Sequence, residues 1–228
     1  MRIYIFIISL FCSLCLYSQE KAIDSSSKKH RYGLRVGTDI SKLIKTAIRS
    51  NYTAFEINAD YKFAKKYYIA GEIGYENHLI NETQINLNTK GSYIKFGVDY
   101  NAYQNWLNME NAIYAGLRYG FSSFSQTLNS YSIYNTDDYW NENNLINTPE
   151  SFNGISSHWI EFIFGIKTEV LNNVYLGVNV QLKRNISNNS AENFDNLYIP
   201  GFGKTYETSK WGVGFGYTIN YFIPFYKK

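Results

Sequence analysis

Ser156 and His158 are the residues of this sequence whose types and spacing could most directly do chemistry. In an extended strand, side chains two positions apart lie on the same face, so the hydroxyl and the imidazole would be neighbours. A serine and a histidine that is oriented by an acid can hydrolyse an ester, such as that of a lipid acyl chain. The neighbouring strand ends offer Ser123, Ser125 and Asn188 but no acid. The triad is therefore incomplete, and we expect no catalytic residue and no enzyme.

Charged residues at alternate positions of strand-like segments are the second candidate for chemistry. The bases are Arg35, Lys62, Lys95, Arg118, Lys167 and Lys183, and the acids are Asp39, Glu56, Asp60, Glu72, Glu76, Asp99, Glu161 and Glu169. The two signs are close to balance. Inside a narrow closed sheet these residues would form a hydrogen-bonded network of ion pairs, because unpaired buried charges are very costly. A proton or ion path through the same residues is the alternative interpretation.

Contact residues for a binding partner are concentrated in the segment 125–156, which is rich in tyrosine, asparagine and serine. The candidates for binding are Tyr131, Tyr134, Tyr139 and Trp140. Such side chains make adaptable contact surfaces, although a hydrophilic loop that only shields a rim has the same composition. The segment 194–202 is too apolar for a loose tether, so we expect it to fold back over the mouth of the structure. His30 and His78 are expected to be solvated, and no metal-ligand spacing or cofactor motif is found.

These residues need a scaffold, and the sequence predicts one made of strands. Apolar and polar residues alternate with a period of two in eight segments, which is the pattern of a strand with one apolar face. The predicted strands lie near 31–43, 52–63, 67–79, 91–102, 111–124, 157–170, 174–186 and 209–223. The aromatic content of 18%, with 22 Tyr and 15 Phe against 3 Pro, also favours strands. We therefore expect an all-β, eight-stranded antiparallel up-and-down barrel over 31–228.

Whether the apolar face of the barrel points outward or inward decides whether the barrel lies in a membrane or in water. A soluble lipocalin-like barrel would show the same alternation with its apolar face turned inward. Here glycines share the charged face, as Gly37, Gly97 and Gly120 do. In a narrow lumen, missing side chains leave room for long charged ones, whereas on a water-facing surface they would serve no purpose. The glycine positions therefore favour a charged lumen and an apolar outer face.

Loop lengths and aromatic positions agree with a barrel that spans a membrane. Connections at 64–66, 103–110 and 171–173 are shorter, and those at 44–51, 80–90, 125–156 and 187–208 are longer. Transmembrane barrels have short periplasmic turns and long extracellular loops, which would put both chain ends in the periplasm. Two aromatic belts are expected at the membrane interfaces. Their members are Tyr32, Tyr61, Phe63, Tyr67, Tyr100, Tyr103 and Trp106 on the periplasmic side, and Tyr75, Phe121, Phe124 and Trp159 on the other.

The beginning of the chain has the features of a secretory signal peptide. Residues 1–18 carry a positive charge at Arg2, an apolar run and a small polar end. Cys12 and Cys15 lie inside this segment, so the mature chain is expected to be free of cysteine. Residues 19–30 are polar and charged, as in a disordered periplasmic lead-in. No later segment reaches the about 20 consecutive apolar residues of a spanning helix. A net charge of +3 spread along the chain gives no basic tract for nucleic acid.

Four stretches carry a resemblance to a known family: 32–37 (YGLRVG), 90–95 (KGSYIK), 116–121 (GLRYGF) and 193–202. Through them the chain resembles a family of uncharacterised β-barrel proteins from Gram-negative bacteria, the domain of unknown function 6048. The resemblance covers nearly the whole mature chain. It implies a location in the outer membrane, with no assigned activity and no catalytic residues to carry over.

The sequence thus predicts a small monomeric barrel of the outer membrane with a plugged polar lumen, which serves envelope integrity or binding at the cell surface. Its expected partners are outer-membrane lipid and, during biogenesis, the barrel-assembly machinery. The aromatic run 221–226 resembles the ending that this machinery recognises, although Lys227 and Lys228 depart from it. The alternatives are a lipid-A-modifying outer-membrane enzyme and a secreted, soluble lipocalin-like barrel that binds a ligand.

Overall fold

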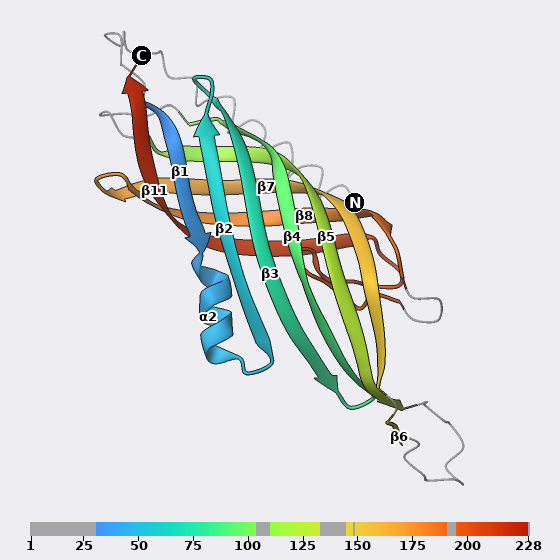
Figure 1. Ribbon diagram of the computed structural model, residues 1–228. Helices are drawn as coiled ribbons and strands as arrows, with labels where there is room; N and C mark the ends of the chain where they lie inside the picture. The colour runs from blue at the N-terminus through green and yellow to red at the C-terminus, as the bar shows by residue number, and fades with distance from the viewer. Residues whose placement is uncertain (1–30, 104–109, 133–144, 148, 191–194, 228) are drawn as a thin grey trace, which may run out of the picture.

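Eight long antiparallel strands form the body of the protein. The computed structural model describes residues 31–103, 110–132, 145–147, 149–190 and 195–227, so the predicted signal peptide and lead-in lie outside the described residues. The long strands are β1 Arg31–Asp39, β2 Tyr52–Lys62, β3 Tyr67–Glu82, β4 Ile85–Asn101, β5 Ala112–Ser132, β7 Glu150–Leu171, β8 Val174–Asn188 and β11 Trp211–Lys227. Each pairs with its neighbours in this order, and β11 pairs with β1 (Figure 1). The predicted all-β antiparallel ring of eight strands is confirmed.

A helix interrupts the first predicted strand. The expectation of a strand over 31–43 is wrong beyond Asp39, where helix α2 (Ile40–Ile48) begins. The carboxylate of Asp39 accepts a hydrogen bond from the backbone N–H of Ser41 at 2.8 Å, so Asp39 is the N-cap of the helix. Ile40, Ile44 and Ile48 recur every four residues, which is a helical spacing. In the described part of the chain no helix is long and apolar enough to cross a membrane.

Two of the predicted long loops contain strand residues. The loop expected at 80–90 is wrong, because β3 and β4 stay paired up to Glu82 and Ile85 and a two-residue turn joins them. In the segment 125–156, residues 125–132 continue β5 and residues 150–156 belong to β7. The polar residues of these strand extensions lie on the outward face. The inward Leu87 and Leu128 are 0% and 7% exposed and pack inside the extended strands. β3, β4, β5 and β7 therefore reach beyond the start of β2 (Figure 1).

The two ends of the ring differ in their connections. One, called the turn end below, has the connections 63–66, 102–111 and 172–173 together with the paired residues Arg31 and Lys227. The opposite one, called the helix end, has α2, the turn 83–84, and the segments 133–149 and 189–210. These segments contain the short strands β6 (Leu145–Ile146), β9 (Tyr198–Ile199) and β10 (Gly203–Lys204). The predicted alternation of short and long connections fails only at the turn 83–84.

Apolar side chains cover the outer face of the ring, and charged side chains fill its interior, called the lumen below. Phe164, Val180 and Phe215 lie side by side on three neighbouring strands and are 61%, 54% and 55% exposed. Inward positions of the same strands hold Glu161 and Lys183, which are buried. A soluble barrel with an apolar interior has the reverse arrangement.

Three aromatic residues that were expected on the outer face are buried instead: Tyr32, Phe124 and Trp159. Phe124 lies an even number of positions from Arg118, and Trp159 from Glu161, so the alternation itself turns both inward. At Tyr32 the pairing of β1 with β11 is irregular, which interrupts the alternation there. Trp106 lies outside the described residues.

The aromatic row at the turn end is continuous over part of the ring. The rings of Phe63 and Tyr67 are 6.2 Å apart, and those of Tyr67 and Tyr100 are 5.4 Å apart. Tyr61 and Phe225 add a further pair at 6.3 Å. All five side chains are on the outer face, so the turn end carries an exposed aromatic border.

Candidate functional site

The fourteen charged residues singled out from the sequence lie on the inward side of the strands. Twelve are buried: Arg35, Asp39, Glu56, Asp60, Lys62, Glu76, Lys95, Asp99, Arg118, Glu161, Lys167 and Lys183. Glu72 and Glu169 are partly buried. The strands carry these residues at alternate positions, so closing the sheet brings them together. The lumen is therefore the first candidate site.

The first group of ion pairs crosses the lumen near its turn end. The carboxylate of Asp60 on β2 receives Arg35 Nε from β1 at 2.6 Å and Lys167 Nζ from β7 at 2.6 Å. Lys167 comes from the opposite side of the ring, because β7 is separated from β2 by several strands in either direction. Asp60 thus links strands on opposite sides of the ring.

A second group lies further along the lumen. Arg118 donates to both carboxylate oxygens of Asp99, at 2.6 and 2.9 Å, in the two-pronged geometry that suits a guanidinium. Lys95 donates to Glu72 at 2.7 Å and lies 3.6 Å from Glu161. Each base is therefore placed against an acid, which offsets the cost of burying the charges.

Three charged residues in the described part of the network were not among the candidates. One is Arg31, whose guanidinium donates to Glu169 at 2.8 Å. Glu110 accepts a hydrogen bond from Lys62 at 2.7 Å, and Lys42 of α2 reaches Glu56 at 3.2 Å and also donates to Glu76. Glu110 precedes the fifth strand, so strand alternation gave no signal for it. Lys42 lies in the predicted strand 31–43, and only the helical spacing of the isoleucines after Asp39 indicates its position at the end of the lumen.

Lys42 contacts side chains of the lumen from the helix end. Its ammonium donates to the hydroxyl of Tyr93 at 2.5 Å, and that hydroxyl donates to Glu56 at 2.5 Å. Burial by itself lowers the pKa of a lysine, but the charges of Glu56 and Glu76 outweigh this effect and hold the pKa of Lys42 well above its usual value. Lys42 is therefore charged at physiological pH and ties α2 to the strands.

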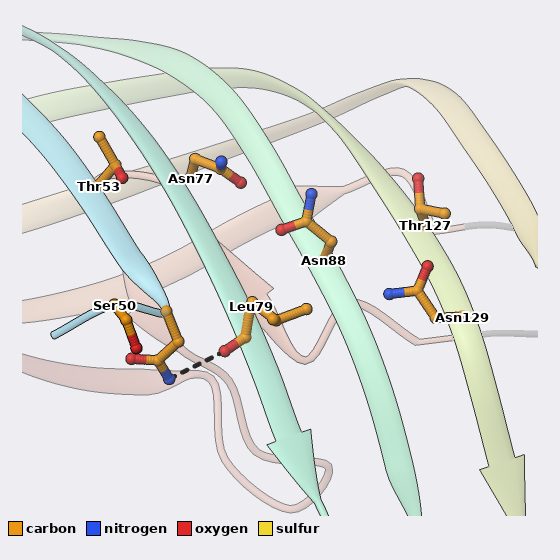
Figure 2. A pocket seen from close by; sticks show the side chains of 8 residues that line it. Ser50, Thr53, Asn77, Leu79, Asn88, Thr127 and Asn129 are labelled. Carbon is orange, nitrogen blue, oxygen red and sulfur yellow. Dashed lines mark hydrogen bonds between the residues drawn. The ribbon is translucent and has the colours of Figure 1, made fainter.

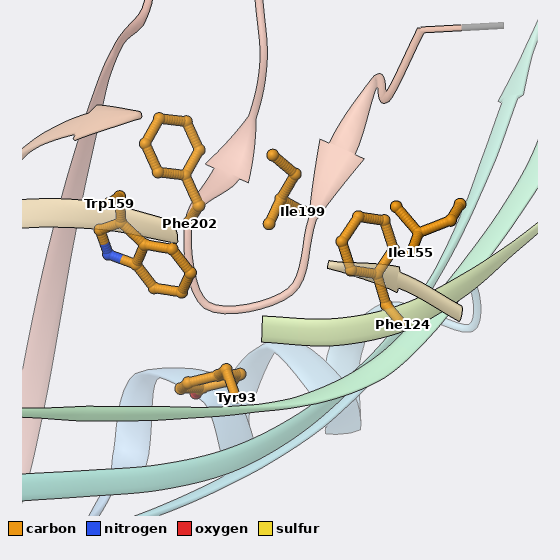
Figure 3. Close-up of a cluster of buried hydrophobic side chains, with 6 residues drawn as sticks. All are labelled: Tyr93, Phe124, Ile155, Trp159, Ile199 and Phe202. Carbon is orange, nitrogen blue, oxygen red and sulfur yellow. The ribbon is translucent and has the colours of Figure 1, made fainter. Parts of the chain in front are cut away.

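The segment with β9 and β10 folds back into the helix end of the lumen, as its apolar composition predicted. Ile199 and Phe202 pack with Tyr93, Phe124 and Trp159 in a buried cluster (Figure 3). The indole of Trp159 and the ring of Phe202 meet edge to face at 5.9 Å. The apolar side chains of this cluster close the lumen at its helix end, next to the ion pairs.

Polar contacts fix the inserted segment to the network. Lys183 Nζ donates to the carbonyl of Gly201 at 2.8 Å, and the N–H of Gly201 donates to Glu76 at 3.2 Å. Gly201 has φ +79, and a Cβ there would come within 2.5 Å of the Tyr93 ring, so only glycine fits. Burial and the charge of Glu76 raise the pKa of Tyr198 well above its usual value, so its hydroxyl stays protonated and donates to Glu76 at 2.7 Å.

One cavity inside the network is small. It lies near Glu72, Lys167 and Thr218 and has a volume of about 20 Å³, which suffices for one water molecule. Side chains of the strands therefore fill most of this part of the lumen. A chain of ion pairs can hold the barrel together, but it leaves little room for a solute.

The two histidines in the described residues have aromatic neighbours. His158 lies on the outer face, where its Nδ1 is 2.6 Å from the hydroxyl of Tyr119 and its ring is 4.9 Å from that of Phe121. His78 was expected to be solvated, but it is half-buried, with the rings of Tyr52 and Tyr198 at 5.5 and 4.6 Å. Tyr198 belongs to the inserted segment, which strand patterns alone did not place.

The candidate contact residues of the longest loop are mostly beyond what the structure describes. Tyr131 lies near the tip of β5, partly exposed, where it pairs with Ile85 and Ile146. Tyr134, Tyr139 and Trp140 lie outside the described residues.

Comparisons with known proteins place the chain in a family. No curated protein matches its sequence. Among solved structures it is similar to Ail, the attachment invasion locus protein of Yersinia pestis, with 9% identity over 86% of this chain and 99% of that chain and a TM-score of 0.40. The model of a family described as a domain of unknown function, DUF6048, matches residues 1–228. The chain therefore belongs to the DUF6048 family, as the resemblance of its sequence implied.

Proposed function

We propose that this protein is a monomeric outer-membrane β-barrel with a closed lumen, which contributes to envelope integrity or to binding at the cell surface without catalysing a reaction. One observation carries the proposal: the outer face of the ring is apolar and exposed, while the charged residues are inside. In water, an exposed apolar surface of this extent is strongly unfavourable. Hydrocarbon around the ring removes that cost.

The height of the apolar band fits a membrane. On β3 the outward residues are apolar or aromatic from Tyr67 to Tyr75 except for Gly71, and the next one outward is Asn77. The eight steps from Tyr67 to Tyr75, at about 3.3 Å each, span roughly 26 Å along the strand, or about 20 Å for a strand tilted by roughly 40°. On β5 the band likewise ends between Phe121 and Ser123. The band is thus close to the about 25 Å that transmembrane barrels present to lipid.

The lengths of the connections support one orientation of the barrel in the membrane. Transmembrane barrels keep short turns in the periplasm and long segments outside, which assigns the turn end to the periplasm. The aromatic border at Phe63, Tyr67 and Tyr100 would then lie at the periplasmic interface, where aromatic rings are favoured. The aromatic run 221–226 on β11 supports recognition by the barrel-assembly machinery.

The closed lumen argues against a pore. The groups around Asp60 and Lys95 join strands across the interior, and the inserted segment covers them at the helix end. The histidine on the outer face supports a non-enzymatic role, because its ring nitrogen is bound to the Tyr119 hydroxyl instead of to an orienting acid. What remains accessible is the surface of the ring and its helix end.

The proposal is tested by membrane fractionation combined with a gel-mobility assay. The protein should be found in the outer-membrane fraction and should migrate faster before boiling than after, because a folded transmembrane barrel resists SDS. In planar bilayers the refolded protein should give no steady conductance. Recovery in the soluble periplasm, or a mobility unchanged by boiling, would overturn the membrane assignment, and a stable open channel would overturn the closed lumen.

A further inference from the structure

Lys90 is an exposed lysine on the outer face of the ring, just beyond the apolar band. It lies on β4 and pairs with Asn77 on β3 and with Ser125 on β5. Asn77 is two positions beyond Tyr75, the last aromatic residue of the band on β3, so this row of residues is the first polar one on that strand. In a membrane the ammonium of Lys90 would lie at the level of the lipid headgroups. The proposed function does not use it.

The outer face gives Lys90 no negative partner among the described residues. Its nearest neighbours on this face are Asn77 and Ser125 across the strands and Asn88 and Ser92 along β4, and all of them are uncharged. The acids of β3 and β4 that form ion pairs lie on the lumenal side. An anion from outside the protein can therefore pair with this ammonium without competition from a carboxylate.

Two further cations adjoin the band at the helix end. Lys45 Nζ of α2 is 4.6 Å from the ring of Phe215, and the guanidinium of Arg184 on β8 is 5.3 Å from the ring of Trp211. Both rings belong to the outer face, and they are 55% and 42% exposed. Basic side chains near a lipid surface attract anionic headgroups. The described border of the band is therefore basic at these places, and at Lys90 it also adjoins a groove.

The groove beside Lys90 is polar and lies on the same face (Figure 2). Its volume is about 410 Å³, within the about 300–1,000 Å³ of small-molecule sites. Asn77 and Asn88, which flank Lys90, line it together with Thr127, which pairs with Asn88 from β5. The other lining residues are Ser50, Asn51, Thr53, Leu79 and Asn129. Amides and hydroxyls supply both donors and acceptors, so the groove suits a headgroup that carries hydroxyl groups.

Hydrogen bonds hold two side chains of the groove in place. The amide of Asn51 donates to the carbonyl of Leu79 at 3.1 Å, and the amide of Asn129 donates to Asn86 Oδ1 at 2.7 Å (Figure 2 shows the first contact). Fixed side chains lose less entropy when a ligand binds. Two sides of the groove are therefore ordered before a headgroup enters it.

We propose that Lys90 and the groove bind an anionic lipid of the adjoining leaflet, one whose phosphate carries a headgroup with hydroxyl groups. The proposal rests on the proposed function, because only a barrel in a membrane brings a headgroup to this height. The phosphate pairs with Lys90, and the hydroxyl groups enter the groove. The acyl chains lie along the band against Tyr75 and Ile94, which are 43% and 46% exposed.

The test is native mass spectrometry of the folded full-length protein in detergent, titrated separately with three lipids. Phosphatidylglycerol has the phosphate and the hydroxyl groups, phosphatidylmethanol has only the phosphate, and digalactosyl diacylglycerol has only the hydroxyl groups. We expect phosphatidylglycerol to bind about fivefold more tightly than the galactolipid, which is the effect of a strong exposed ion pair. It should bind about threefold more tightly than phosphatidylmethanol, which is the effect of a hydrogen bond.

Two variants separate the charge from the groove. Lys90→Gln keeps a polar side chain but removes the charge, so the preference over the galactolipid should disappear and the preference over phosphatidylmethanol should stay. Asn88→Leu removes an amide of the groove and should have the opposite effect. The matched control is Lys204→Gln, which makes the same change in net charge at an exposed lysine of β10 in the inserted segment and should keep both preferences.

Equal affinities for phosphatidylglycerol and the galactolipid, or a Lys90→Gln variant that keeps the preference, would overturn the inference. An Asn88→Leu variant that still prefers phosphatidylglycerol over phosphatidylmethanol would overturn the role of the groove. Every variant is first checked for a heat-sensitive gel mobility. A wild-type protein without that mobility contradicts the proposed function itself, whereas a folded barrel without lipid preference contradicts only the lipid site.

Discussion

At the scale of single residues, Lys42 connects the helix to the lumen. Its ammonium contacts Glu56, Glu76 and the Tyr93 hydroxyl, so removing it leaves two buried carboxylates without their common partner. We predict that Lys42→Met destabilises the protein by about 3 kcal/mol, the usual cost of breaking a buried ion pair from one side. The measurement is urea unfolding of the refolded protein in lipid vesicles.

The control for this prediction is Lys45→Met, one helical turn away. Lys45 lies 4.6 Å from the ring of Phe215 and belongs to no ion pair among the described residues, so its loss should cost at most about 1 kcal/mol. Equal unfolding midpoints for the two variants would show that the contacts of Lys42 with the acids do not stabilise the fold.

His158 is the residue on which an enzymatic role would depend. Its ring contacts Tyr119 and Phe121 on the outer face. We predict that cells that overproduce the wild-type protein, His158→Ala or neither contain the same lipid A species. Mass spectrometry of extracted lipid A is the measurement. A change that is caused by the wild-type protein and absent with His158→Ala would establish a lipid-modifying enzyme.

At the scale of elements, the inserted segment closes the helix end through Phe202. This side chain is 3% exposed and packs on Trp159. We predict that Phe202→Ala destabilises the protein by about 3–5 kcal/mol, the range for a large cavity in a buried cluster. Tyr206→Ala is the control, because Tyr206 is 57% exposed beside the same segment. Thermal unfolding in detergent should separate the two variants, and a Phe202→Ala midpoint equal to that of Tyr206→Ala would show that the segment is not part of the folded core.

The elements also show how far the sequence predicts the fold. Alternation is a local property, so it correctly identified the eight strands and the inward side of residues such as Asp60 and Arg118. It did not find α2, because Ile40 satisfies both a strand and a helix pattern until the cap at Asp39 is considered. The polar residues near 80–90 predict a loop, but polar side chains on an outward face leave the strand hydrogen bonds intact.

The candidate site was predictable only in part for a similar reason. The sequence indicated which charged residues face inward, but the partner of each depends on closure of the ring. The contact of Lys167 with Asp60 joins residues that are 107 positions apart. The roles of Lys42 and Glu110 depend on a helix and a connection that carry no strand pattern.

At the scale of the whole molecule, the exposed apolar band predicts how the protein tolerates charge. Val180 lies in the middle of the band, and Ser123 lies in the first polar row beyond it. We predict that Val180→Arg costs about 2–4 kcal/mol in a lipid bilayer, whereas Ser123→Arg costs about 0–1 kcal/mol. Equilibrium unfolding in phospholipid vesicles measures both. Equal tolerance of arginine at the two positions would indicate that water, and not hydrocarbon, surrounds the band.

The most direct test of the account measures contact between this band and hydrocarbon. The sequence holds 2 Cys, both in the predicted signal segment, so a single cysteine introduced into the mature chain can carry a fluorescent label. Labels at Leu117→Cys and Val180→Cys should be strongly quenched in vesicles of lipids with brominated acyl chains, and a label at Ser123→Cys should be quenched much less. Weak and equal quenching at all three positions would contradict a barrel that spans the membrane.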